Sequence, residues 1–141
     1  MKTFKLDNWL PTTKKEVEAR GWDYLDVILF SGDAYVDHPS FGPAIISRVL
    51  EAEGYRVAVM AQPDWKDPAA FTALGRPLLG VLLSAGNIDS MVAHYTVAKR
   101  RRTEDAYSPG KRPGLRPDRA TIVYANRCRE AFPGLPVVIG G

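Results

Sequence analysis

The stretch DVILFSGDAYVDHPSFGPAIISRVLEAEGYRVAVMA, residues 26–61, indicates the fold of this protein. It opens with the apolar run DVILF, which is typical of a strand buried in a parallel sheet. After a polar loop, apolar residues recur at helical spacing from Phe41 to Ala52. The run YRVAVMA, residues 55–61, then predicts a second strand. Strand, helix and strand in this order form the unit from which parallel sheets are built.

The same alternation continues on both sides of this unit. Upstream, TKKE at residues 13–16 has the spacing of a capping box and predicts a short helix. Downstream, the sequence predicts a helix over 68–74, a strand over 77–86, a helix from Ile88, a helix from Asp118 and a strand over 135–141. This order predicts an α/β three-layer sandwich with a mostly parallel sheet, flavodoxin-like or Rossmann-like in type.

Two single residues are assigned by their place on the predicted helices. His94 falls off the apolar stripe of its helix, so we expect it at the surface. Cys128 shares the stripe of Tyr124 and Phe132, so we expect it in the core. With one cysteine in the chain, neither an internal disulfide nor a multi-cysteine metal site is expected.

Composition places the chain among globular proteins without a membrane span. The 141 residues correspond to one domain, with 45% hydrophobic and 25% charged residues. No apolar run approaches the roughly 18 residues of a transmembrane helix, and the N-terminus lacks the apolar core of a signal peptide. A cytoplasmic location with no membrane partner is therefore expected.

The net charge of +3 is concentrated in one segment. Between Lys99 and Arg119 lie eight basic and three acidic residues. Pro and Gly interrupt this stretch repeatedly, so residues 98–117 are predicted to be a basic loop insertion. Such a loop binds nucleic acid or nucleotide phosphates, docks on an acidic protein face, or is simply solvated. The cations available for the first of these roles are Arg100, Arg101, Arg102, Lys111 and Arg112.

Polar residues gather where predicted strands end, and ligands bind beyond the carboxyl ends of strands in open parallel sheets. In the first such loop, Asp33, Asp37 and His38 are candidates for polar-ligand binding or acid–base work, whereas capping and turn formation are the structural alternatives. In SAGNIDS, residues 84–90, Gly86 permits close backbone approach, and Asn87 or Asp89 either caps the next helix or binds a ligand. The patterns GxGxxG, GxxxxGK[ST] and GxSxG do not occur in the sequence, which disfavours dinucleotide binding, P-loop chemistry and a serine hydrolase elbow.

Long ordered motifs resemble those of the YgiQ-like radical SAM proteins. The match begins at about Trp9 with LPTTKKEVEARGWDYLDVILFSGDAYVDHPSFGPAIISRVLEAEGYRVAVMAQPDW, and continues through SAGNIDSMVAHYT, KRRRTEDAYSPG, RPDRATIVYANRCREAF and PVVIGG. The resemblance implies a longer protein, and Gly141 is accordingly expected to be an internal point of it. It also implies a downstream radical SAM barrel in which a CxxxCxxC motif holds a [4Fe–4S] cluster that cleaves S-adenosylmethionine. None of those cysteines occurs here, so this chain alone is not expected to be catalytic.

The chain is also similar in organisation to the cobalamin-binding domains that precede the barrel in related radical SAM enzymes. Those with a cobalt-ligating histidine use DxHxxG after the first strand, a serine after the third and GG after the fourth. Here Asp37, His38 and Gly42 have the spacing DHxxxG, Ser84 holds the serine position, and Gly140 begins the final GG. The one-position displacement of His38 argues against direct cobalt ligation, so cobalamin is the less favoured candidate.

The first hypothesis is an N-terminal domain that binds a cofactor or substrate, or docks, for the downstream radical SAM barrel of the same polypeptide, whose substrate the sequence does not name. The residues expected at its binding site are Asp37, His38, Ser40, Gly42, Ser84, Gly86, Asn87, Asp89 and Gly140. The alternative hypothesis is a nucleic-acid- or nucleotide-binding module that acts through the basic loop.

Overall fold

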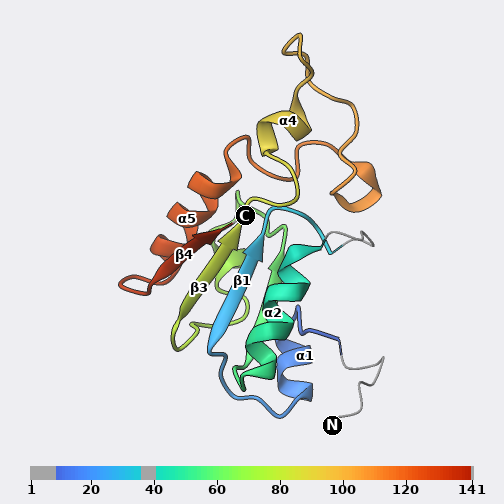
Figure 1. Ribbon diagram of the computed structural model, residues 1–141. Coiled ribbons are helices and arrows are strands. Elements are labelled where there is room, and N and C mark those ends of the chain that lie inside the picture. Colours follow the sequence, from blue (N-terminus) through green and yellow to red (C-terminus); the bar gives the residue numbers. More distant parts are fainter. Residues whose placement is uncertain (1–8, 36–40, 141) are drawn as a thin grey trace.

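The computed structural model describes residues 9–35 and 41–140, and within them it shows a four-stranded, all-parallel sheet. The strand order is β2-β1-β3-β4 (Figure 1). The strands are β1 (Val27–Ser31), β2 (Val57–Ala61), β3 (Gly80–Ser84) and β4 (Val137–Gly140). The α/β parallel-sheet fold predicted from the sequence is confirmed.

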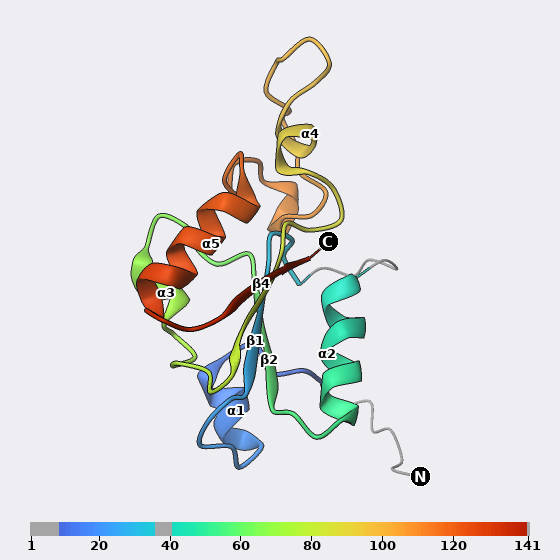
Figure 2. The same cartoon turned by 60° about the vertical axis from the view of Figure 1, so that its left-hand side comes forward.

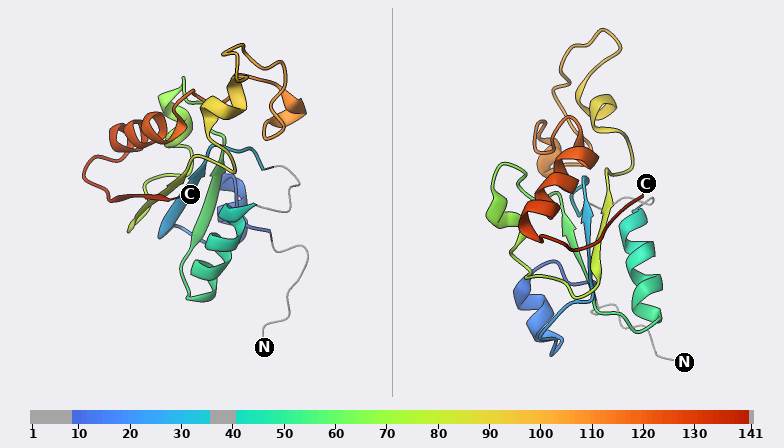
Figure 3. Two further views of the ribbon diagram at one scale, coloured as in Figure 1. Left: turned by 45° about the horizontal axis from the view of Figure 1, so that its top comes forward. Right: turned by 90° about the vertical axis from the view of Figure 1, so that its left-hand side faces the viewer.

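Helices cover the two faces of the sheet unequally. The helices are α1 (Lys14–Ala19), α2 (Gly42–Ala52), α3 (Pro68–Phe71), α4 (Ser90–His94) and α5 (Ala120–Ala131), with a short 3₁₀ helix, η1, at Pro109–Lys111. Figure 2 and the right-hand view of Figure 3 show α1, α3 and α5 on one side of the sheet and α2 on the other. For the helices that lie between strands, this split follows from right-handed crossovers, because the chain moves one way from β1 to β2 and the opposite way from β2 to β3 and β4.

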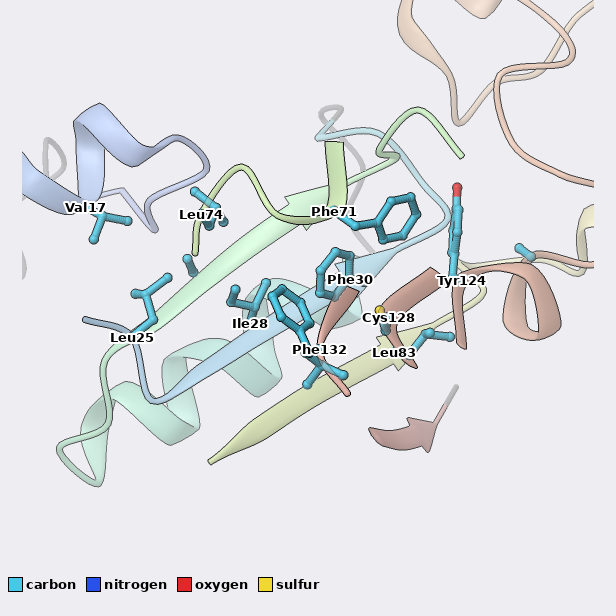
Figure 4. Packing of buried hydrophobic residues seen from close by; sticks show 13 residues of the cluster. Val17, Leu25, Ile28, Phe30, Phe71, Leu74, Leu83, Tyr124, Cys128 and Phe132 are labelled. Carbon is cyan, nitrogen blue, oxygen red and sulfur yellow. The ribbon is translucent and has the colours of Figure 1, made fainter. Parts of the chain in front are cut away.

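The main hydrophobic core lies on the face covered by α3 and α5. Phe30 of β1 stacks on Phe71 of α3, with 5.5 Å between ring centroids, and Phe71 meets Tyr124 of α5 at 5.9 Å (Figure 4). Cys128 and Phe132 complete this side of the core and are buried. The prediction that Cys128 is a core residue is therefore confirmed.

Local capping explains where the short N-terminal helix begins. Thr13 accepts a hydrogen bond from the Glu16 N–H at 3.2 Å, as the capping-box spacing predicts. The Glu16 carboxylate accepts in return from the Thr12 N–H at 2.7 Å, one residue earlier than the motif requires. Gly21, at φ +73°, then takes the left-handed conformation that ends the helix.

The helix predicted from Ile88 is shorter than expected, and the side of it that is buried is not the predicted one. It covers only Ser90–His94, and Tyr95 is already extended and forms an antiparallel bridge with Arg101. His94 is 3% exposed, whereas Val92, expected on the apolar face, is exposed. The surface assignment of His94 was therefore wrong, because contacts from the basic segment bury this side of the helix. No helix among the described residues combines the length and apolar character needed to cross a bilayer.

Candidate functional site

Five of the predicted site residues line a single hollow in the structure. The hollow has a volume of about 530 Å³ and lies between the start of α2 and the carboxyl ends of β3 and β4. The predicted residues on its wall are Gly42, Ser84, Gly86, Asn87 and Gly140. Its volume falls within the range of roughly 300–1,000 Å³ that is usual for small-molecule sites.

The register of the parallel sheet explains this convergence. Ser84 of β3 pairs with Gly140 of β4, and Ser31 of β1 pairs with Ser84, so the strand ends form one level edge. Two residues earlier in each strand, and so on the same face of the sheet, Leu29, Leu82 and Val138 form an apolar row that also lines the hollow. The site thus has an apolar floor and a small polar rim.

Asp37, His38 and Ser40 lie outside the described residues. Their assignment to the same site stays a prediction. Gly42, which begins α2 directly after them, does reach the hollow.

Asp33 holds the rim of the hollow in shape. Its carboxylate accepts a hydrogen bond from the Asn87 N–H at 2.7 Å and another from Arg116 Nη1 at 3.0 Å. Gly86 passes so close that a Cβ built on it would lie 2.3 Å from Asp33 Oδ1, and its φ of +112° also favours glycine. Ser84 Oγ accepts from the Gly86 N–H at 3.2 Å. Asp33 therefore has an internal structural partner for each carboxylate oxygen, and it shapes the site from behind.

Arg116 connects this rim to the basic segment. Its guanidinium is fully buried and donates to both oxygens of Asp105, at 2.9 Å from Nε and 2.7 Å from Nη2. Asp105 also accepts from the Tyr107 N–H at 3.0 Å and from Ser108 Oγ at 2.9 Å. We call Asp33, Arg116 and Asp105 the buried ion cluster. Through it, the segment expected as a loop is folded onto the strand ends.

In the buried ion cluster, the pKa values of the two carboxyls are shifted in opposite directions. Burial by itself would raise the pKa of Asp105, but the hydrogen bonds from Arg116 and from the Tyr107 N–H outweigh it and lower that pKa. For Asp33, burial is the stronger influence and raises the pKa, although the Asn87 N–H and Arg116 act the other way. The cluster is thus most firmly paired between Arg116 and Asp105.

Directly after α4, the Tyr95–Arg101 bridge closes a hairpin over residues 95–101, which we call the projecting hairpin. A second group of polar side chains lies at its base. Asp118 accepts hydrogen bonds from the Tyr95 hydroxyl at 2.8 Å and from His94 Nδ1 at 2.7 Å. The bond from His94 is the main reason that the pKa of Asp118 is lowered. Because an ionised carboxylate only accepts, His94 is the donor in this bond, through Nδ1. This group braces the hairpin against the start of α5.

Asp89 and the surface cations stand apart from the hollow. Asp89 caps α4 by accepting from the Met91 N–H at 2.8 Å, which is the structural alternative considered for it. Arg100, Lys111 and Arg112 are exposed. Arg102 is exposed but donates to the Val92 and Tyr95 carbonyls. Its neighbour Arg101 lies over the Tyr95 ring and 3.8 Å from Asp118.

Sequence reasoning missed the role of Arg116 and Asp105. Arg116 was counted among the loop cations, and no local pattern separates it from them. Asp105 carried a weak signal, since an Asp in a segment rich in turns often accepts from the backbone N–H two residues later, as Asp105 does from Tyr107. Among the residues that the structure describes, no group of three or more His, Cys, Asp or Glu side chains is placed to hold a metal ion.

Known protein sequences match this chain over almost its whole length. A family model described as Radical SAM N-terminal matches residues 9–141. A UPF0313 protein of Bacteroides thetaiotaomicron is 59% identical over an alignment of 141 positions that covers 99% of this chain and 23% of that protein. A UPF0313 protein of Porphyromonas gingivalis is 59% identical over 137 residues, 96% of this chain and 22% of that protein. The chain therefore spans less than a quarter of these relatives, and no solved structure matches it.

Proposed function

This chain belongs to the radical SAM N-terminal family, and on that premise we propose that its hollow binds an organic small molecule for the radical SAM region of the full-length protein. The family implies a [4Fe–4S] cluster and S-adenosylmethionine in that region. The single cysteine of this chain, Cys128, is buried in the core and is no cluster ligand. The N-terminal domain would then hold a cofactor or substrate beside the barrel that performs the chemistry.

The convergence of separate chain segments on one hollow carries this proposal. Gly42, Ser84, Gly86 and Gly140 come from the start of α2 and from the ends of β3 and β4. They meet at the carboxyl edge of a parallel sheet, where ligands of such folds bind. Gly42 and Gly140 leave room for close approach, since a Cβ on either would meet no atom of the described residues within 4 Å.

The lining also defines the chemical class of the ligand. Leu29, Pro43, Ile46, Leu82 and Val138 provide apolar surface, and the described lining includes no charged side chain. A buried charge without a partner is costly, so the enclosed part of the ligand is neutral. Ser84 and Asn87 at the rim offer hydrogen bonds to one polar end. We therefore infer a ligand with a neutral, apolar ring or chain and a polar group at its mouth-side end.

Cobalamin is the first compound to test against this inference. Gly42, Ser84 and Gly140 are the positions that match the pattern of cobalamin-binding domains, and all three line the hollow. The displaced His38 argues for a bound form in which no histidine ligates cobalt. The alternative ligand is a neutral substrate that is unrelated to cobalamin.

The test uses the full-length protein and a variant that fills the hollow. Native mass spectrometry would detect a co-purified compound, and calorimetry with hydroxocobalamin would measure binding. Gly140→Leu is expected to weaken binding by about tenfold or more, because the leucine occupies the ligand's space. Ile139→Phe is the matched control, since Ile139 precedes Gly140 in β4 but is not among the residues that line the hollow. Binding that is unchanged in Gly140→Leu, or the absence of both a co-purified compound and cobalamin binding, would refute the proposal.

A second candidate function rests on the projecting hairpin. Figure 1 shows the segment after α4 extending away from the sheet, and the Tyr95–Arg101 bridge closes it. Exposed cations there and at Lys111 and Arg112 suit a polyanion such as RNA. Fluorescence anisotropy with a single-stranded RNA should then show salt-dependent binding that Arg100→Ala with Arg112→Ala weakens and Arg129→Ala, at an exposed position on α5, leaves unchanged. Equal effects of these variants would exclude a specific role of the hairpin.

A further inference from the structure

The helix α2 presents apolar side chains to solvent. Ile46 is 49% exposed and Val49 is 59% exposed, and the neighbouring Ile45 is exposed as well. The residues that α2 buries against the sheet are instead Pro43 and Ser47. A helix on a sheet normally turns its apolar stripe inward. The outward stripe of α2 therefore indicates a partner that the described residues do not supply.

The sheet beside α2 is uncovered in the same region. Val59, Leu29, Leu82 and Val138 form one row across β2, β1, β3 and β4. Val59 and Leu29 are buried under α2, Leu82 is half-buried, and Val138 is 57% exposed. Burial thus decreases steadily with distance from α2. We call Ile46, Val49, Leu82 and Val138 the open half-face.

The dimensions of this surface match one more helix. Strands lie about 4.8 Å apart and a helix with its side chains is about 10 Å wide, so one helix covers about two strands. α2 contacts β1 and β2, and the opposite face has α3 and α5. A single additional helix over β3 and β4, alongside α2, would complete the layer.

The relatives indicate where this helix comes from. More than three quarters of each UPF0313 relative lies outside the part that this chain matches, which is their N-terminal part. The polypeptide that follows the matched part leaves from the carboxyl end of β4. That end lies at the rim of the hollow, close to the start of α2, as Gly42 and Gly140 share its wall (Figure 3). A short connection suffices to bring a following helix onto the surface, and short connections have a small entropic cost.

We propose that a helix of the polypeptide following β4 in the full-length protein packs on the open half-face through apolar side chains. This helix would cover Leu82 and Val138, contact the outward stripe of α2 and form the outer wall of the hollow. The inference rests on family membership and on the exposed row, and it holds whether or not the hollow binds a small molecule.

The test measures the accessibility of the open half-face in the full-length protein. Ile46→Cys and Val138→Cys would be compared with Ile122→Cys on α5, which is 54% exposed and lies on the opposite side of the sheet. Pulse labelling with N-ethylmaleimide, resolved by peptide mass spectrometry, separates these positions from cluster cysteines. Positions 46 and 138 should label about tenfold or more slowly than position 122, because labelling requires the helix to open. Equal rates at the three positions would overturn the proposal.

Two further arms identify what covers the surface. A photoreactive p-benzoylphenylalanine at position 46 should cross-link to a peptide that follows β4 in the same molecule. Protection that grows with protein concentration, with cross-links between molecules, would identify a second copy instead and overturn the proposal. If the protection of positions 46 and 138 from labelling disappears in the Gly140→Leu background, a small molecule rather than a helix covers the surface, and the proposal is overturned. Protection that persists there supports the helix even if ligand binding fails.

Discussion

Replacing Arg116 by alanine is expected to lower the free energy of unfolding by about 3–5 kcal/mol, the usual cost of removing one partner from a buried ion pair. The Arg116 side chain has no exposed surface, and it donates to Asp105 at 2.7 and 2.9 Å and to Asp33 at 3.0 Å. Its removal would leave two buried carboxylates facing each other without a counter-charge. A domain of this size is stable by only about 5–15 kcal/mol, so the loss would be a large fraction of the total.

The assay is equilibrium urea unfolding of the chain at neutral pH, in which the midpoint shifts while the slope stays constant. Arg100→Ala, at an exposed position, is the matched control and is expected to stay within about 0.5 kcal/mol of the parent chain. Arg116→Lys keeps the charge but loses the fork that holds both oxygens of Asp105, so it should fall between the two.

A double-mutant cycle distinguishes the ion cluster from simple loss of packing. Arg116→Ala combined with Asp105→Ala should cost less than the sum of the single changes, with a coupling of roughly 0.5–3 kcal/mol for groups in contact. Additive effects, or a loss below about 1 kcal/mol for Arg116→Ala alone, would show that Arg116 is solvated. The view that this residue fastens the basic segment to the strand ends would then be abandoned.

Three further predictions concern single features of the fold. Gly86→Ala should destabilise the chain by more than Gly75→Ala: both glycines have positive φ, which costs about 1–3 kcal/mol for alanine, but only at Gly86 would the new Cβ also overlap a carboxylate. Burial raises the pKa of the Cys128 thiol to about 12, so iodoacetamide should modify it only after urea unfolds the chain, and modification in buffer would contradict its placement. The pKa values of Asp105 and Asp118 are lowered on folding, so their contribution to stability should be complete above their ordinary pKa of 3.8 and lost as the pH falls below it. Asp118→Asn should therefore reduce the fall of the urea midpoint at acid pH, and an unchanged fall would argue against the hydrogen bonds that Asp118 accepts from His94 and Tyr95.

The sequence alone predicted that residues from separate strand ends would lie together. Carboxyl ends of parallel strands meet at one edge, so residues that follow the strands become neighbours once the strands are recognised. Ser84 and Gly140 share a register level, and Gly42 begins the helix that follows β1. Asp89 does not line the hollow with them: it caps α4, a local interaction that the sequence allowed equally.

The direction of the helix faces was less predictable. The apolar stripe of α2 was recognised, but its exposure depends on which strands lie beneath it and on what covers β3 and β4. The same holds for His94, which is buried by contacts with Asp118, 24 residues later in the chain. Periodicity identifies an amphipathic helix without saying what each side meets.

By itself, the sequence determined the parallel α/β fold, the order of its elements and the edge of the sheet where the candidate site residues gather. These follow from apolar runs, helical spacing and turn residues, each of which acts within a few positions along the chain. Only the tertiary structure decided that Arg116 pairs with Asp33, 83 residues away, and that one half of the sheet stays open beside α2. Charge pairing and surface coverage are settled by distance in space, and local patterns contain no measure of that distance.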